Sequence, residues 1–162
     1  MKRWDQRPIE IRNLFNPAFC GVILTRALQG YEELQSEGMP FSLSLLVLPV
    51  CLHKDTRDVL GANARARLLK IIESNPQLLV GFADRARNLL PYTLEALGLL
   101  MHLGCIEVTG TGSLKYVVRS VRTKVQGTPE TVDCQRVARI VGKEFARIAD
   151  RVTVYATFGV RP

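Results

Sequence analysis

Cysteine and histidine are the usual side chains of zinc sites and of many nucleophilic active sites, and this chain has four cysteines and two histidines. Cys51 and His53 are close in sequence, but two ligands do not make a zinc site without partners. The other candidates, Cys105, Cys134 and His102, stand singly in apolar surroundings. No two cysteines form a CxxC pair, so we expect buried, reduced thiols and no metal.

A catalytic triad would need a nucleophile beside a base that an acid orients. His53 has Asp55 and Asp58 nearby in a polar segment that we expect to be exposed, but its position favours a residue at a helix end. The glycine-containing segment 110–115 lacks the Walker spacing and lies between two predicted strands, so it is interpreted as a hairpin turn. With no paired carboxylates for acid–base catalysis, the sequence predicts a protein that is not an enzyme and binds no cofactor.

The overall composition is that of a globular domain. Of the 162 residues, 47% are hydrophobic, which is enough to bury a substantial core in one domain. The N-terminal segment 1–8 is polar, unlike a signal peptide, and the longest apolar run, 43–52, is too short to span a bilayer. We therefore expect a soluble cytoplasmic protein that does not insert into a membrane.

Two pairs of residues mark the starts of long helices. Asn16-Pro17 and Thr128-Pro129 combine a capping side chain with a proline in the first turn, and they predict helices at 16–37 and 129–150. The last segment, 151–162, is apolar and is expected to be extended. Such a tail must dock on this domain or on a partner.

The middle of the chain has the pattern of two helices followed by a β-hairpin. Apolar residues at helical spacing predict helices at 77–88 and 92–103, separated at Pro91. Two β-prone runs at 105–109 and 114–119 then flank a glycine-containing loop. Helix, helix and hairpin in this order indicate a winged helix.

The remaining elements complete the predicted fold. The apolar run 43–52 is interpreted as a core helix bent at Pro49, and 63–74 as a further helix. The sequence thus predicts a single α+β, mainly helical domain over residues 1–162. Its winged-helix-like core lies at about 42–120, and the N- and C-terminal helices pack on that core.

Positive charge is concentrated in the last third of the chain, within a formal net charge of +7. Residues 1–100 carry 12 Lys/Arg against 10 Asp/Glu, and residues 101–162 carry 10 against 5. DNA reading by the predicted helix 92–103 is not favoured, because it contains no lysine or arginine. Candidate contacts with nucleic acid or an acidic partner are instead Lys115, Arg119, Arg122, Lys124, Arg136, Arg139, Lys143 and Arg147. The alternative for the last four is the solvated face of an amphipathic helix.

Five groups of short stretches, spread over nearly the whole chain, occur together in the order typical of one protein family. They are Trp4-Asp-Gln-Arg-Pro8, Leu14-Phe-Asn-Pro-Ala-Phe-Cys20, Leu48-Pro-Val-Cys-Leu-His-Lys54 with Thr56-Arg57, Leu97-Gly98 with Leu103-Gly-Cys105, and Gly159-Val-Arg-Pro162. In these stretches the chain resembles the middle components of bacterial three-component ABC systems. The resemblance implies two partners from the same locus, an ABC-class ATPase and an effector protein, and a role in conflict with phages or mobile elements. It brings no catalytic residues with it.

We hypothesise that the family-like stretches contact the partners or support the contacts. The candidate partner-binding residues are Trp4, Arg7, Pro8, His53, Lys54, Arg57, Tyr155, Phe158 and Arg161. The sequence therefore favours a non-catalytic adaptor that couples the ATPase to the effector. The alternative is a winged-helix DNA-binding protein or transcriptional regulator, whose DNA contacts would weaken steeply with salt.

Overall fold

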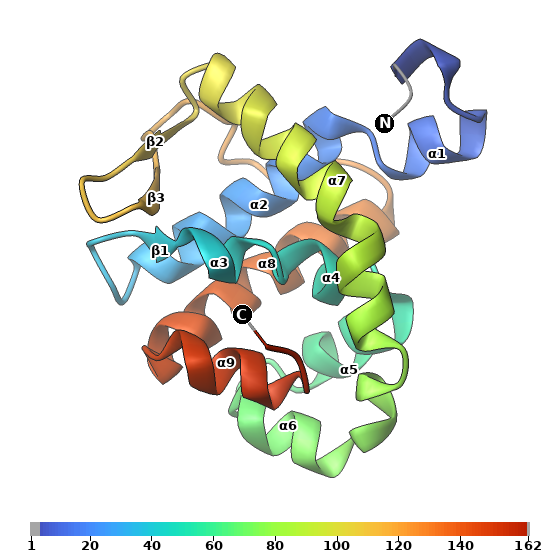
Figure 1. The fold of residues 1–162 in the computed structure, drawn as a ribbon, viewed down its shortest axis with the longest axis vertical. Coiled ribbons are helices and arrows are strands. Elements are labelled where there is room, and N and C mark those ends of the chain that lie inside the picture. The colour runs from blue at the N-terminus through green and yellow to red at the C-terminus, as the bar shows by residue number, and fades with distance from the viewer. Residues whose placement is uncertain (1–3, 162) are drawn as a thin grey trace.

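The computed structural model describes residues 4–161 and is mainly helical, with one small antiparallel sheet (Figure 1). In chain order the elements are η1 (Trp4–Gln6), α1 (Ile9–Leu14), α2 (Pro17–Glu32), β1 (Met39–Pro40), α3 (Phe41–Ser44), α4 (Val47–Cys51), α5 (Lys54–Ala62), α6 (Leu68–Ser74), η2 (Pro76–Leu79), α7 (Phe82–His102), β2 (Ile106–Val108), β3 (Ser113–Tyr116), α8 (Pro129–Ile148) and α9 (Arg151–Thr157). This confirms the predicted α+β, mainly helical class.

Helices α2 and α8 cross at the centre of the fold, and glycines allow their backbones to touch. A Cβ atom added to Gly30 would lie 2.1 Å from the carbonyl oxygen of Arg139. One added to Gly142 would lie 1.9 Å from the carbonyl oxygen of Ala27. Such distances are far below van der Waals contact, so the crossing requires glycine at both positions.

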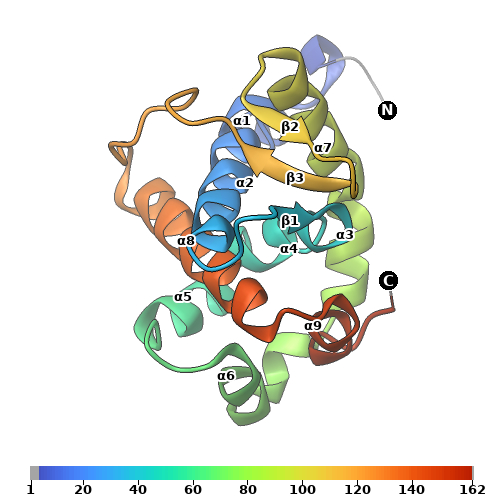
Figure 2. The same ribbon diagram turned by 90° about the vertical axis from the view of Figure 1, so that its left-hand side faces the viewer.

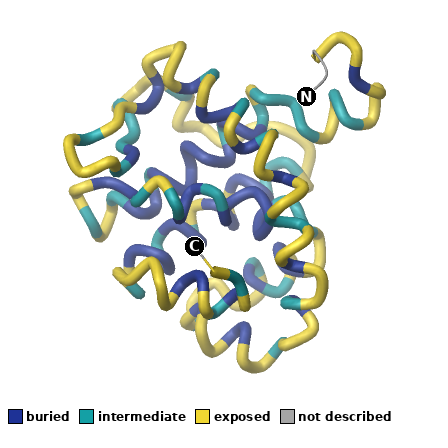
Figure 3. The backbone as a smooth tube through the Cα atoms, viewed as in Figure 1, coloured by how far each residue is buried: buried dark blue, intermediate teal, exposed yellow. Residues whose placement is uncertain are grey.

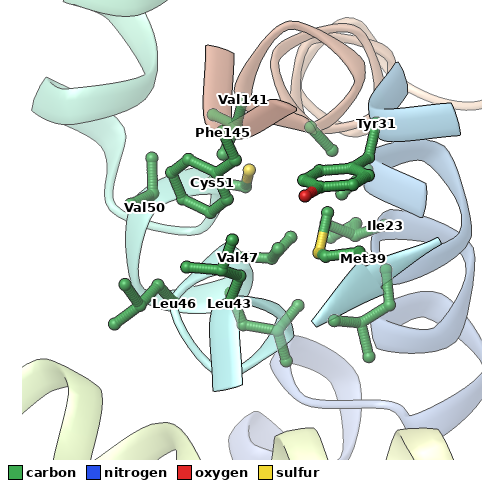
Figure 4. Close-up of a cluster of buried hydrophobic side chains, with 14 of the residues drawn as sticks. Ile23, Tyr31, Met39, Leu43, Leu46, Val47, Val50, Cys51, Val141 and Phe145 are labelled. Carbon is green, nitrogen blue, oxygen red and sulfur yellow. The ribbon is translucent and has the colours of Figure 1, made fainter. Parts of the chain in front are cut away.

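The two predicted helix starts are confirmed. The side chain of Asn16 accepts a hydrogen bond from the backbone N–H of Ala18, and that of Thr128 accepts one from Thr131. Helix α2 ends at Glu32, earlier than predicted, because the chain turns there to bring β1 to the sheet. Side chains from α2, β1, α3, α4 and α8 then fill the core between these helices (Figure 4).

The predicted hairpin is present as β2 and β3, and a third strand joins it. The strand order is β1-β3-β2, with both pairs antiparallel. Ile106 lies opposite Tyr116 in the hairpin, and Met39 lies opposite Leu114 on the other side of β3. Strand β1 has two residues and ends in Pro40, which is tolerated at a sheet edge. A strand this short leaves no alternating pattern from which it could be predicted.

Helix α7 is continuous, so the predicted break at Pro91 is wrong. The proline removes one intrahelical donor, the one that would bond the carbonyl of Arg87. Both residues are exposed, so water can reach that carbonyl. Leu89 and Thr93 are buried on either side of the proline, and this packing holds the helix together across it.

The apolar run 43–52 is buried as predicted, but the chain there forms two short helices instead of one bent helix. Helix α3 ends at Ser44 and α4 begins at Val47. Pro49 is the third residue of α4, where its missing N–H costs no intrahelical bond. The bend predicted at Pro49 therefore lies several residues earlier.

The segment after α4 is also more ordered than predicted. Instead of an exposed exit, residues from Lys54 form helix α5, in which Thr56 and Arg57 are buried. Helix α6 then covers the second half of the predicted helix 63–74.

The C-terminal segment is helical instead of extended, and it docks on the chain's own core. Asp150 caps α9 by accepting hydrogen bonds from the N–H groups of Val152 and Thr153. Tyr155 and Phe158 are buried. Figure 3 shows the resulting alternation of buried and exposed positions along the chain's last helix.

The four thiols are buried and free, as predicted. Burial raises the pKa of Cys20 to about 12, so this thiol stays protonated at neutral pH and is not an activated nucleophile. Within residues 4–161, no cluster of three or more His, Cys, Asp or Glu side chains is placed to hold a metal ion. In the same part of the chain, no helix combines the length and apolar character needed to cross a membrane.

Candidate partner-binding grooves beside α7

One face of α7 is an apolar ridge that the rest of the chain leaves uncovered. We define the α7 ridge as its exposed apolar and small residues Ala83, Leu90, Pro91, Leu94, Gly98 and Met101. Leu90, Leu94 and Met101 are 37%, 46% and 40% exposed. Residues 91, 94, 98 and 101 recur every three to four positions, and 83, 90 and 101 are separated by about two and about three whole turns, so all six share one side of the helix. A row of exposed apolar side chains along one side of a helix is typical of a protein-binding surface.

A groove lies on one side of α7, which we call the N-terminal groove. Its volume is about 260 Å³, and its lining residues are Leu14, Phe15, Pro49, Leu52, His53, Arg85, Asn88 and Leu89. Its walls come from the end of α1, the end of α4 and the first half of α7. Two of the family-like stretches, 14–20 and 48–54, therefore meet here although they are far apart in sequence.

A second groove, which we call the C-terminal groove, lies on the other side of α7. Its volume is about 450 Å³, and its lining residues are Leu45, Leu46, Ala83, Ala86, Arg87, Leu90, Tyr155, Gly159, Val160 and Arg161. The arginines at 87 and 161 are exposed, and the first also pairs with Asp84. This groove is therefore apolar at its base and positively charged at its rim.

Arg7 fastens the N-terminal segment to α7. Its guanidinium donates to both carboxylate oxygens of Glu95, each at 2.7 Å, and lies 5.9 Å from the ring centre of Tyr92. Its side chain is buried. Trp4 and Pro8 flank it and are exposed, so they, and not Arg7, are accessible on this segment.

Arg57 is a second buried arginine that ties distant elements together. Its guanidinium donates to Glu130 of α8 at 2.7 Å and to the carbonyl oxygens of Cys51 and Leu52 at 3.1 and 3.3 Å. Its side chain is 3% exposed. Arg57 therefore supports the wall of the N-terminal groove from inside the fold.

His53 caps helix α5, as its position in the sequence indicated. Its Nδ1 accepts the backbone N–H of Thr56 and lies 2.8 Å from that residue's hydroxyl. Lys54, the next residue, is exposed and pairs with Asp58. Burial lowers the pKa of His53, with a further contribution from Arg85, so the neutral ring is favoured.

The His53 cap predicts a pH dependence of stability. Because its pKa is lower in the folded state than the usual 6.5, the unfolded chain binds the proton more tightly. The contribution of the neutral His53 ring to the free energy of unfolding is therefore complete above pH 6.5. It is lost as the pH falls through the folded-state pKa. We expect the free energy of unfolding to decrease from pH 7 to pH 5, and His53→Asn, which keeps a capping side chain, to reduce that decrease. Urea unfolding at several pH values measures this dependence. If the free energy of unfolding of the variant changed with pH as much as that of the natural protein, His53 would not be its source.

Tyr155 and Phe158 lie inside the fold, beneath the C-terminal groove. The hydroxyl of Tyr155 donates to the carbonyl oxygen of Ser42 at 2.7 Å, and this bond ties α9 to α3. The ring of Phe158 stacks on that of Phe82, with 4.6 Å between centroids. Of the candidate residues in the tail, Arg161 is the exposed one. The other two support the groove.

The comparison with protein families shows to which family the chain belongs. The family described as ABC-three component (ABC-3C) system Middle Component 3 matches residues 4–162. The chain belongs to this family. The resemblance seen in the sequence is thereby confirmed. No match is found among curated proteins or among solved structures.

In this middle component, the basic residues predicted on α8 are paired within the chain. The ion pairs are Arg136 with Asp133 at 3.2 Å, Arg139 and Lys143 with Glu33, each at 2.6 Å, and Arg147 with Glu144. Lys115, Arg119, Arg122 and Lys124 precede α8, and within the described residues they form no ion pair. Among these candidate residues, the positive charge that forms no ion pair therefore lies on the hairpin and on the connector that follows it.

The sequence analysis missed the α7 ridge. The helix is apolar on most sides, so its sequence pattern does not show that Leu94 and Met101 are exposed. The available signal was Gly98, which occurs where an added Cβ atom would meet nothing within 4 Å. A glycine inside a helix costs about 1 kcal/mol relative to alanine, and in this middle component no packing among residues 4–161 requires it.

Proposed function

We propose that this middle component is a non-catalytic cytoplasmic adaptor that couples an ABC-class ATPase to an effector protein in defence against phages or other mobile elements. Membership of this family supports the existence of partner proteins, because the family is described as one component of a three-component system. The observation that carries the proposal is the exposed α7 ridge with a groove on each side.

The grooves differ in a way that suits two different partners. The N-terminal groove is mainly apolar and has His53 and Arg85 at its edge. The C-terminal groove carries Arg87 and Arg161, so it fits an apolar partner segment that bears acidic residues. Both grooves share the wall formed by α7. A shift of this helix caused by one partner would therefore reach the other.

The adaptor proposal predicts that charge on the ridge abolishes assembly. We expect Leu90→Glu with Leu94→Glu to weaken binding to at least one partner by about a hundredfold or more, because the interface would bury two unpaired carboxylates. The chain should remain folded, since both side chains are exposed. Co-purification with the products of the two flanking genes, with and without nucleotide, followed by mass determination, measures the effect.

Leu69→Glu is the matched control, because Leu69 is similarly exposed, at 40%, but lies on α6. Assembly that survives in the ridge variant, or that is lost equally in the control, would contradict the assignment of this surface.

A second candidate, a winged-helix DNA-binding protein, is supported by the topology. In chain order, α2 precedes β1, α7 precedes the hairpin, and β1 pairs with the second strand of that hairpin. This order supports a winged helix, in which α7 would take the position of the recognition helix. Its exposed ridge is apolar, however, and apolar side chains do not read base edges through hydrogen bonds. The adaptor is therefore the function that the geometry supports better.

A further inference from the structure

Arg26 is a buried cation whose hydrogen-bond partners are all neutral. Its side chain lies in the middle of α2, and the residue is 4% exposed. It donates to the side-chain oxygens of Gln135 and Gln29 at 3.3 and 3.1 Å, and to the carbonyl oxygen of Arg122 at 2.6 Å. Arg7 and Arg57, the other buried arginines described above, each have a carboxylate. Within residues 4–161, Arg26 forms no ion pair with a carboxylate.

A buried charge without a counter-ion is costly, because water no longer solvates it. Burial lowers the pKa of the Arg26 guanidinium, the nearby Tyr116 raises it, and the nearby charge of Arg139 lowers it. None of these contributions comes from a carboxylate. The position would be stabilised by a negative group from outside the chain.

Arg26 lies beneath a surface that carries further positive charge. It lines two adjoining pockets of about 250 and 390 Å³, between the connector at 117–128 and α8. The cations that line them are Arg26, Arg122, Lys124, Arg136, Arg139 and Lys143. The carboxylates paired with these cations are Asp133 and Glu33, which leaves an excess of four positive charges.

Most of the exposed side chains at this surface are polar, unlike those of the α7 ridge, and they stand over a half-buried apolar base of Phe19, Val22, Val121, Val132 and Ile140. Protein-binding surfaces depend on buried aromatic or aliphatic anchors, whereas contacts with nucleic-acid phosphates depend on Lys and Arg. A single small anion would also neutralise only part of the excess. These features favour a ligand with a row of negative charges over an acidic protein.

We propose that this surface binds the phosphodiester backbone of nucleic acid, with Arg122 and Lys124 contacting phosphates and Arg26 supplying buried charge beneath them. Contacts of this kind position a nucleic acid without reading its sequence. Figure 2 shows the connector and α8 on the side of the molecule away from α7. The inference is therefore independent of the adaptor proposal, and both contacts can be made at once.

The test uses a fluorescein-labelled, mixed-sequence DNA duplex of about 20 base pairs. Fluorescence anisotropy measures its binding to the full chain over a range of salt concentrations. We expect Arg122→Glu with Lys124→Glu to weaken binding at least about tenfold and to reduce the slope of log affinity against log salt by about two. Arg65→Glu with Lys70→Glu is the matched control, because both residues are exposed on another part of the surface and the change in charge is equal. This control should stay within about twofold of the natural protein.

Arg26→Met tests the buried charge separately. We expect a chain that remains folded, as monitored by circular dichroism, and that binds the duplex less tightly at every salt concentration. A natural protein that does not bind the duplex at low salt would overturn the proposal, as would equal losses in the Arg122/Lys124 variant and its control. Displacement of the duplex by poly-glutamate at equal charge concentration would also overturn it, in favour of an acidic protein ligand.

Discussion

We expect Gly142→Ala to lower the free energy of unfolding by more than about 3 kcal/mol, at the upper end of the cost of overpacking a core. The added methyl group would lie 1.9 Å from the carbonyl oxygen of Ala27 and 3.0 Å from the backbone nitrogen of Tyr31. These neighbours are backbone atoms of α2, which cannot rotate away as a side chain could. The helices would have to separate, and the buried residues around the crossing would lose their contacts.

Gly98→Ala is the matched control for this prediction. An added Cβ atom at Gly98 meets nothing within 4 Å, and the residue lies inside α7. We expect this variant to be more stable by about 0.5–1 kcal/mol, because alanine favours a helix more than glycine does. Urea unfolding followed by circular dichroism measures both. If the two variants had equal stability, the close crossing of α2 and α8 would be disproved.

The elements that the sequence predicts well are those fixed by local chemistry. The capping residues Asn16 and Thr128 predict the starts of their helices, because capping depends on neighbouring residues. The hairpin is likewise local. Strand β1 and the continuity of α7 through Pro91 depend on packing against distant parts of the chain, and no local pattern reports that packing.

The candidate site was harder to predict for the same reason. Arg7 and Arg57 were expected to contact the partners or to support the contacts, and the sequence could not show that both are buried, because their carboxylates lie 88 and 73 residues away in the sequence. Arg26 was missed because its burial depends on Gln135 and on the connector, which follow it by about a hundred residues. A charged residue gives no sign in the sequence of whether its partner is present.

We expect Phe158→Ala to cost about 3–5 kcal/mol, the usual cost of removing a buried aromatic ring. Phe158 is 2% exposed, stacks on Phe82, and meets Phe145 edge-on with 6.3 Å between centroids. The ring thus joins the last turn of the chain to α7 and α8. Its loss would leave a cavity beside the rings of Phe82 and Phe145.

Val152→Ala is the control, because Val152 is in the same helix but 58% exposed, and we expect a change within about 0.5 kcal/mol. Thermal and urea unfolding compare the two. Equal stability would mean that α9 is not part of the core.

The expected result also decides how the tail is tested for partner binding. Deletion of 151–162 would remove core residues, so a lost complex would report unfolding. Arg161→Glu changes the rim of the C-terminal groove alone, so a complex lost in that variant reports the contact itself.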